Sequence, residues 1–176
     1  TLRKRIPNVS IRSGIIVGYP GETQEEFEEL KQFVRDFEFD HLGVFAYSHE
    51  ENTASYTLPE QIEESVKQAR REEIMQTQQE ISRQRLERFM DEEIEVLIEG
   101  PSEESEFLLK ARHQGQAPDI DGHVLVHSAS YKAGEFHTVR VEQTMDYDLV
   151  AGPLDLEEAL THSERLTEIA NPTQPC

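Results

Sequence analysis

Residues Ser13–Thr23 read SGIIVGYPGET, and this stretch decides how the first part of the chain folds. Ile15–Val17 are three consecutive β-branched residues, which is typical of a strand buried on both faces. Gly18 stops the apolar run and Pro20-Gly21 predicts a turn, after which an acidic segment with helical periodicity begins. Strand, turn and helix make one βα unit. In parallel sheets, ligands bind at the carboxyl ends of the strands, where this turn lies.

The flanking residues extend this unit into a strand–helix–strand motif. Val9–Val17 is predicted as a strand, and Thr23 and Glu26 have the spacing of a capping box. His41–Tyr47 is predicted as a second strand, and short connections favour a parallel pair joined by a right-handed crossover. The helix between the strands carries one apolar stripe, made of Phe27, Leu30, Phe33, Val34 and Phe37.

The loops after the two strands form the first candidate site. Gly14, Gly18 and Gly21 would let a ligand approach the backbone closely, although spacing alone favours a tight turn with no ligand. The polar loop Ser48–Pro59 leaves the same sheet edge, so the two loops are expected to form one lip of a cleft. A Walker phosphate loop is excluded, because no lysine follows the glycines.

Glu60–Met90 is predicted to be one helix, because it contains neither glycine nor proline. Its narrow apolar stripe predicts a solvated linker helix that leans on a neighbouring domain, with Glu, Gln and Arg on the opposite face. A coiled-coil helix is the alternative, although the heptads are not sustained. The stripe consists of Ile62, Val66, Ala69, Ile74, Ile81, Leu86 and Phe89.

From Glu92 onward the apolar period changes from 3.6 to 2, which indicates strands. Five short strands are predicted within about 60 residues, the pattern of a small closed barrel of the oligonucleotide-binding type. They begin with the alternation at Ile94, Val96 and Ile98 and continue through Phe107–Arg112, His123–His127, Thr138–Gln143 and Tyr147–Ala151. The acidic residues 155–176 are predicted to be partly disordered.

Charge restricts the partners of this module. The chain carries a net charge of −19, and residues 91–154 contain fourteen acidic and four basic side chains. This excess argues against binding a nucleic-acid backbone and favours a basic partner. The sequence has no secretory signal and no apolar run long enough to span a bilayer, so we expect a cytoplasmic protein without membrane contact. Thr1 stands where a methionine would begin a chain, which favours a piece of a longer protein.

Metal-binding and hydrolytic sites are not predicted. His123 and His127 would share one face of a strand, but no local spacing of a zinc site accompanies them. Asp119-x-Asp121-Gly122 lacks the later ligands of a calcium loop and is read as a turn. Ser48 and His49 are adjacent at a strand end, so their side chains should point apart, which disfavours a hydrolase.

Several of these segments, in this order, resemble the methylthiotransferases, a group of radical S-adenosylmethionine enzymes. Ile15–Thr23 (IIVGYPGET) is similar to their segment IVGFPGET, and Val44–Ala54 resembles the region around YSPEEGTPA. Leu58–Ile62 and Gln78–Ser82 match the linker that follows, and the five-stranded module resembles their TRAM domain. The matches cover roughly residues 3–154.

Within the group, Ala117–Gly122 and Asp146–Val150 resemble the RimO branch, which methylthiolates an aspartate of the small-subunit ribosomal protein S-twelve. The resemblance implies an α/β plus all-β fold. Residues 1–59 would be the last βαβ part of a partial parallel α/β barrel, and residues 60–90 a long linker helix. Residues 91–154 would be an OB-like TRAM barrel that binds the basic protein substrate.

The resemblance also implies a cofactor site. Ser13, Gly18, Pro20 and Gly21 would help to hold S-adenosylmethionine, and Tyr47 and Ser48 would line the substrate side. In the intact enzyme, one four-iron four-sulfur cluster would cleave S-adenosylmethionine to a radical that attacks the β-carbon of the target aspartate. Sulfur carried at a second such cluster would then be transferred.

This chain does not contain the cysteines that hold those clusters, since its single cysteine is Cys176. We therefore expect the segment to bind neither cluster, to contain no catalytic residue and to be inactive by itself. His49, Asn52 and Ser55 depart from the family's loop and put its conformation in doubt. Two alternatives stay open: a MiaB-type enzyme that modifies an adenosine of transfer RNA, and a non-catalytic TRAM adaptor.

Overall fold

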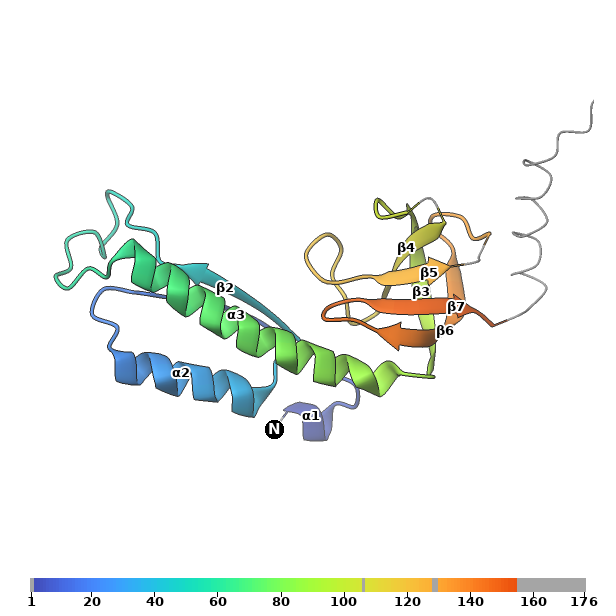
Figure 1. The fold of residues 1–176 in the computed structure, drawn as a ribbon, viewed down its shortest axis with the longest axis horizontal. Coiled ribbons are helices and arrows are strands. Elements are labelled where there is room, and N and C mark those ends of the chain that lie inside the picture. The colour runs from blue at the N-terminus through green and yellow to red at the C-terminus, as the bar shows by residue number, and fades with distance from the viewer. Residues whose placement is uncertain (1, 106, 128–129, 155–176) are drawn as a thin grey trace, which may run out of the picture. The chain divides into compact units, whose positions relative to one another are not determined.

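A computed structural model describes residues 2–105, 107–127 and 130–154. The chain divides into two compact units, Thr1–Arg85 and Leu86–Cys176. The predicted acidic tail, residues 155–176, lies outside the described residues. In order, the elements are α1 (Leu2–Arg5), β1 (Arg12–Val17), α2 (Gln24–Phe37), β2 (His41–Ala46), α3 (Glu64–Leu86), η1 (Glu87–Phe89), β3 (Glu93–Pro101), β4 (Leu108–His113), β5 (Val124–His127), β6 (Phe136–Thr144) and β7 (Leu149–Pro153) (Figure 1).

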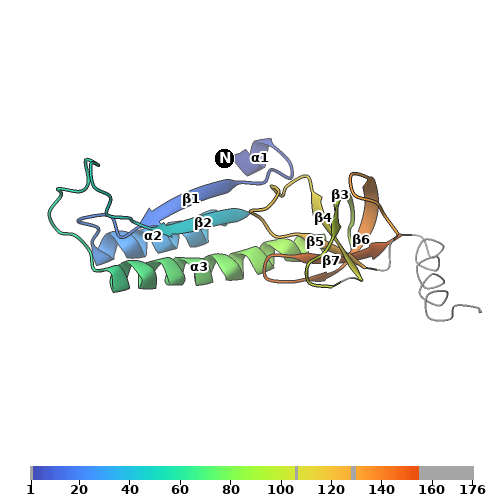
Figure 2. The ribbon, with the colours of Figure 1, turned by 90° about the horizontal axis from the view of Figure 1, so that it is seen from above.

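A parallel two-stranded sheet forms the centre of the first unit. β1 and β2 pair in parallel from Arg12 opposite His41 to Val17 opposite Ala46, which confirms the predicted pairing. Figure 2 shows α2 and α3 on the same side of this sheet. The core between the sheet and the two helices consists of Val17, Phe27, Val34, Phe39, Leu42, Val44, Ile74 and Ile81.

The other face of the sheet is open in the described part of the chain. Ile16 and Phe45 point to this face and are each 60% exposed. The prediction that the run Ile15–Val17 is buried on both faces is therefore wrong for this structure. The sheet has two strands here, and both helices pack against the same face, so alternate side chains stay exposed.

The start of α2 has the predicted capping box. The Thr23 hydroxyl accepts a hydrogen bond from the Glu26 amide at 3.2 Å, and the Thr23 amide donates to the Glu26 carboxylate at 2.8 Å. These bonds from Thr23 lower the pKa of the Glu26 carboxyl group. The helix ends at Phe37, and Glu38 caps it in the left-handed conformation with φ of 54°.

α3 is a second layer of the first unit and buries side chains that the sequence analysis placed on a solvated face. Ile74 and Ile81 reach the core as predicted, but Val66 is exposed. Gln78 is buried and its amide nitrogen donates to the Phe39 carbonyl at 2.9 Å. Long polar side chains can cover apolar surface with their stems while their ends are paired, and hydropathy patterns do not detect this. The other buried polar residues of α3 are Lys67, Arg70, Thr77 and Ser82.

Asp40 links three parts of the first unit near the amino ends of the strands. Its carboxylate accepts hydrogen bonds from the Ile11 amide at 2.9 Å and from Arg3 at 3.0 Å. Its other oxygen accepts from Arg85 Nε at 2.9 Å and lies 2.8 Å from Arg85 Nη2. The Asp40 side chain is only 4% exposed, so these bonds hold α1 and the end of α3 to the sheet in a place that water hardly reaches.

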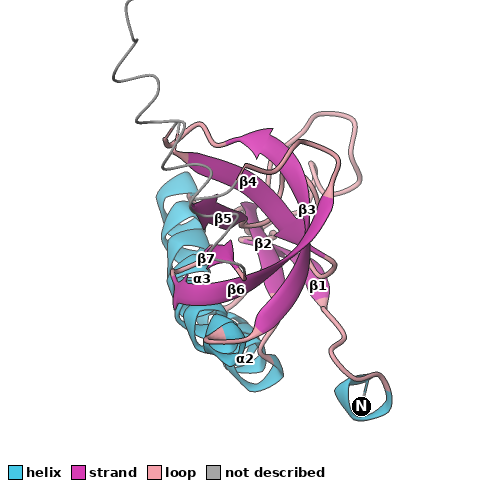
Figure 3. Cartoon of the chain, turned by 90° about the vertical axis from the view of Figure 1, so that its right-hand side faces the viewer, coloured by secondary structure: helices cyan, strands magenta, loops and turns pink. Residues whose placement is uncertain are grey.

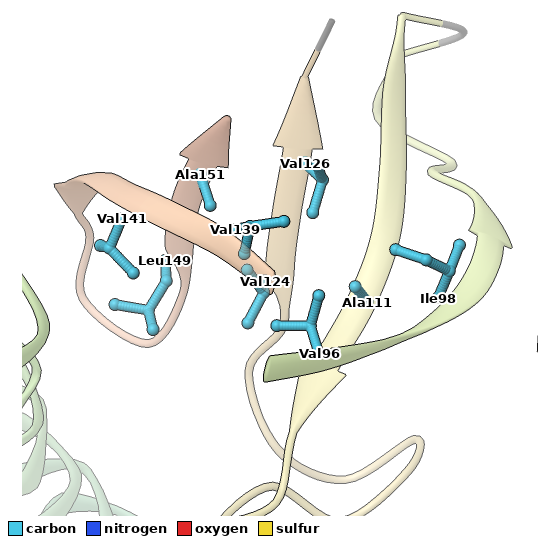
Figure 4. Close-up of a cluster of buried hydrophobic side chains, with 9 residues drawn as sticks. All are labelled: Val96, Ile98, Ala111, Val124, Val126, Val139, Val141, Leu149 and Ala151. Atoms are coloured by element: carbon cyan, nitrogen blue, oxygen red, sulfur yellow. The ribbon is translucent and has the colours of Figure 1, made fainter. Parts of the chain in front are cut away.

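The second unit is the predicted five-stranded closed barrel, with strand order β3-β4-β5-β7-β6 (Figure 3). β5 and β7 pair in parallel, and the other neighbours pair antiparallel. The inward-facing side chains fill the barrel as the alternating pattern predicts (Figure 4). They are Val96, Ile98, Ala111, Val124, Val126, Val139, Val141, Leu149 and Ala151.

Replacing Asp40 by asparagine should lower the free energy of unfolding of the first unit by ~3 kcal/mol, because two arginines would lose a buried charged partner. Native-state hydrogen exchange of the β1 and β2 amides measures this change. Glu38→Gln is the matched control: its carboxylate is 55% exposed and 3.5 Å from Arg85, so its loss should cost less than ~1 kcal/mol. Equal effects of the two substitutions would contradict the role of Asp40.

Candidate functional site

The carboxyl ends of β1 and β2 bring the two predicted site loops to one edge of the sheet. The Tyr47 amide donates to the Val17 carbonyl at 2.9 Å, so the parallel pairing continues to the point where both loops begin. The loop after β1 contains Gly18–Glu22 and runs into α2, and the loop after β2 runs from Tyr47 to α3. This is the edge at which parallel α/β folds bind ligands.

The loop after β1 is a tight turn. The Glu22 amide donates to the Tyr19 carbonyl at 2.9 Å across Pro20 and Gly21, and Gly21 has φ of 87°. Proline followed by a residue with positive φ is the pattern of a type II turn, which explains the residue types at both positions. The Gly21 amide donates to the Glu60 carbonyl at 3.1 Å and so joins the turn to the segment that precedes α3.

Gly18 shapes this turn in two ways. Its φ is 76°, a conformation that other residues adopt only with strain. A Cβ atom at this position would lie 2.4 Å from Cγ of Lys67, so the stem of Lys67 fills the space that a side chain would need. The Gly18 amide donates to the Glu22 carboxylate at 3.0 Å. This glycine thus closes the turn and lets α3 approach it.

Tyr47 is buried against both loops and α3. Its ring meets that of Tyr19 edge to face at 5.3 Å, and the ammonium group of Lys67 lies 5.3 Å from its ring centroid. The Tyr47 side chain is 9% exposed, and its hydroxyl group has no hydrogen-bond partner among the described residues. Lys67 also donates to Glu64 at 3.2 Å, and hydrogen bonds from Gln68 and Lys67 lower the pKa of Glu64.

The loop after Tyr47 is held by contacts within itself. The Ser48 hydroxyl donates to the Glu50 carboxylate at 2.5 Å. The His49 ring stacks on Tyr56 at 4.4 Å and its Nε2 lies 2.9 Å from the Tyr56 carbonyl oxygen. Ser48 and His49 therefore have separate partners, as expected for neighbours that point apart, and this geometry does not suit a nucleophile and its base.

The structure brings most of the predicted site residues together. Gly18, Pro20 and Gly21 form the turn after β1, while Tyr47 and Ser48 begin the neighbouring loop. Ser13 is separate, since it lies near the start of β1 and, by alternation, on the helix-covered face.

Sequence reasoning missed the residues that support this edge, which are Glu22, Lys67 and Arg70. Arg70 and Lys67 belong to a helix whose charged composition suggested solvent exposure. No local motif connects them to a turn almost fifty positions earlier, so a single sequence held no signal for them.

Metal coordination is not a feature of the described residues: nowhere among them do three His, Cys, Asp or Glu side chains gather as they would around an ion. His127 pairs with the Glu142 carboxylate at 2.8 Å. The single cysteine, Cys176, lies outside the residues that the structure describes. No helix within residues 2–105, 107–127 and 130–154 has both the length and the apolar character needed to cross a membrane.

Comparison with known proteins identifies both units. Residues 92–153, which contain all five barrel strands, match the TRAM domain family. Over 150 residues the chain is 48% identical to the ribosomal protein uS12 methylthiotransferase RimO of Myxococcus xanthus, covering 85% of this chain and 32% of that protein. The proteins of the same name from Geobacter sulfurreducens and Sorangium cellulosum are 44% and 45% identical over 149 and 159 residues. Those matches cover 85% and 90% of this chain and 33% of each relative.

The chain is thus a TRAM-domain protein whose barrel follows a parallel α/β unit. It belongs to the RimO family, and it matches a carboxy-terminal part of these proteins. It spans about a third of the length of the curated relatives that it matches.

Gly18→Ala should destabilise the first unit more than Gly21→Ala, although both glycines have positive φ. The difference arises because a Cβ at Gly21 would meet its nearest atom only at 3.5 Å, an ordinary contact, whereas a Cβ at Gly18 overlaps Lys67. We expect about 1–2 kcal/mol from strain at each site and a further loss at Gly18. Unfolding followed by hydrogen exchange in β1 measures both. The double variant Gly18→Ala/Lys67→Ala should recover part of the extra loss, and no recovery would contradict the overlap.

Proposed function

We propose that this chain is part of an enzyme that adds a methylthio group to the β-carbon of an aspartate in ribosomal protein uS12 by radical S-adenosylmethionine chemistry. The carboxyl edge of β1 and β2 contributes to the cofactor and substrate side of the active site, and the TRAM barrel binds the protein substrate. The two iron–sulfur clusters that this chemistry requires are held by other residues of the intact enzyme, in the cytoplasm.

One observation carries the proposal: identity of 44–48% extends over 149–159 residues, across both structural units, to relatives named for this activity. A match confined to the barrel would have supported only a shared TRAM domain. Because the α/β unit matches as well, the similarity includes the strand ends at which the candidate site lies.

The described residues would serve an S-adenosylmethionine site mainly by holding its loops in place. The Gly18 amide is bonded to Glu22 and its open side is filled by Lys67, so this glycine holds the turn in place instead of offering a free donor. Tyr19 is largely exposed at the same edge, and the unpartnered hydroxyl of Tyr47 lies in the neighbouring loop. When bound, the cofactor supplies the radical chemistry. This edge of the sheet would position the cofactor and exclude water from it.

The charge of the barrel supports a basic protein as its partner. Three of the four basic side chains in residues 91–154 already contact carboxylates of the same barrel. Arg112 lies 2.9 Å and Lys110 3.9 Å from Glu99, and Arg140 lies 2.6 Å from Glu93. Binding to RNA phosphates needs cations that are free to replace counterions, and these are engaged.

Grafting residues 3–154 in place of the matching part of the Myxococcus xanthus relative tests the proposed activity. In cells that lack their own enzyme, the chimera should restore the methylthio group on uS12, detected by mass spectrometry of the protein. The relative without its carboxy-terminal part is the control and should leave uS12 unmodified. A folded chimera that modifies transfer RNA, or that binds uS12 without modifying it, would contradict the proposal.

The chain alone should bind uS12 and not transfer RNA, because the barrel is acidic. Fluorescence anisotropy with labelled uS12 should show binding that weakens as salt rises, since the attraction is between exposed charges. Glu103→Lys/Glu104→Lys reverses two exposed acidic groups and should weaken binding, whereas Glu25→Lys/Glu29→Lys in α2 reverses two exposed acidic groups of the other unit and is the matched control. Tight, salt-sensitive binding of transfer RNA would overturn this partner.

A further inference from the structure

We propose that Glu22 and Arg70 are positioning residues of the candidate site, because the ion pair between them sets the conformation of the Gly18–Glu22 turn. The proposal rests on the proposed function, in which this turn forms part of the cofactor wall. It assigns to α3, expected from the sequence to be a linker, the task of holding a site loop.

Glu22 holds the turn from inside. Its Oε2 accepts the Gly18 amide at 3.0 Å, and its own amide donates to the Tyr19 carbonyl at 2.9 Å. One residue therefore closes the turn at both its first and second positions. Because Gly18 directly follows β1, the carboxylate also fixes the direction in which the chain leaves the strand.

Arg70 holds Glu22 from outside. One guanidinium nitrogen, Nη1, donates to Glu22 Oε1 at 2.5 Å and to the Glu22 carbonyl at 3.1 Å. The side chains of Arg70 and Glu22 are only 9% and 13% exposed, so each charge depends on the other for its partner. The guanidinium carbon lies 5.2 Å from the ring centroid of Phe27 in α2, which fixes the arginine from another side.

The same helical turn of α3 also supports the second loop. Lys67 stands three residues before Arg70, a spacing that places both side chains on one face of the helix. Its stem packs against Gly18, and its ammonium group lies over the ring of Tyr47. Lys67 and Arg70 thus contact both strand-end loops, through the packing of the Lys67 stem and through their charged groups.

The competing explanation is that Arg70 only stabilises the first unit in a general way. A second buried cation of this unit, Lys31, provides the control that separates the two explanations. Lys31 of α2 is as buried as Arg70, lies 5.6 Å from the same Phe27 ring and pairs with Glu73 of α3 at 2.5 Å. The partners of Lys31 are Glu28, Glu73 and the Phe27 ring, all outside the turn. Lys31→Met therefore removes an α2–α3 ion pair whose cation is as buried as Arg70, and it leaves the turn intact.

The first measurement uses the chain itself. Hydrogen exchange of the Gly18 amide should accelerate by at least about tenfold in Arg70→Met, because Arg70 no longer holds its acceptor, the Glu22 carboxylate, in place. Exchange of the α2 amides reports the general loss of stability in Arg70→Met and Lys31→Met. Arg70→Lys, which keeps the charge but not the planar fork, should fall between wild type and Arg70→Met. The Gly18 exchange rates are corrected for the general loss of stability that the α2 amides report. If Arg70→Met and Lys31→Met then accelerate exchange at Gly18 equally, the proposal is overturned.

The second measurement uses the chimera with the Myxococcus xanthus relative. Arg70→Met should raise the KM for S-adenosylmethionine by about tenfold or more, whereas Lys31→Met should leave it within about twofold. An unchanged KM together with a freed Gly18 amide would show that Arg70 positions the turn but that the turn does not serve the cofactor, which overturns the assignment to the site. If the unmodified chimera is inactive, the proposed function fails, and the exchange experiment still decides whether Arg70 holds the turn.

Discussion

The attachment of α3 to the parallel sheet through buried charged side chains is the constraint on which the first unit depends. Arg70 bonds Glu22 near one end of the helix and Arg85 bonds Asp40 near the other, with Ile74, Gln78 and Ile81 between them. A two-stranded sheet buries little surface, so a single helix would leave much of one face exposed. The ion pairs bring the second helix to that face and determine its register along the strands.

The side chains that attach α3 to the sheet also contact the loops of the candidate site. The charged groups near the end of α3 that faces the strand ends are also those that contact the Gly18–Glu22 turn and Tyr47. An apolar contact would hold the helix equally well but would not specify the conformation of a polar loop. Directional bonds from Arg70 Nη1 to the Glu22 carboxylate and carbonyl do specify it, so Arg70 fixes the loop as well as the helix.

Local patterns predicted the parts of the fold that local physics determines. The capping box at Thr23, the parallel pairing after a short crossover and the five alternating strands all follow from residues close together in sequence. The burial of Arg70 and Gln78 could not be predicted, because their partners lie 48 and 39 residues away and hydropathy treats both side chains as solvated. Ser13 is separated from the turn because it lies near the start of β1, whereas its expected role came from resemblance alone.

The candidate site could be located from sequence but not explained by it. Glycine spacing alone favoured a tight turn without a ligand, and the structure shows why: Gly18 is needed for the turn and for the approach of Lys67 whether or not a ligand binds. The buried pair of Asp40 and Arg85 shows that such a pair can also serve attachment alone. The Glu22–Arg70 pair differs in that its bonds reach the backbone of a turn, through the Glu22 carbonyl and the Gly18 amide. On the proposed function, these bonds supply the precision that a binding loop requires.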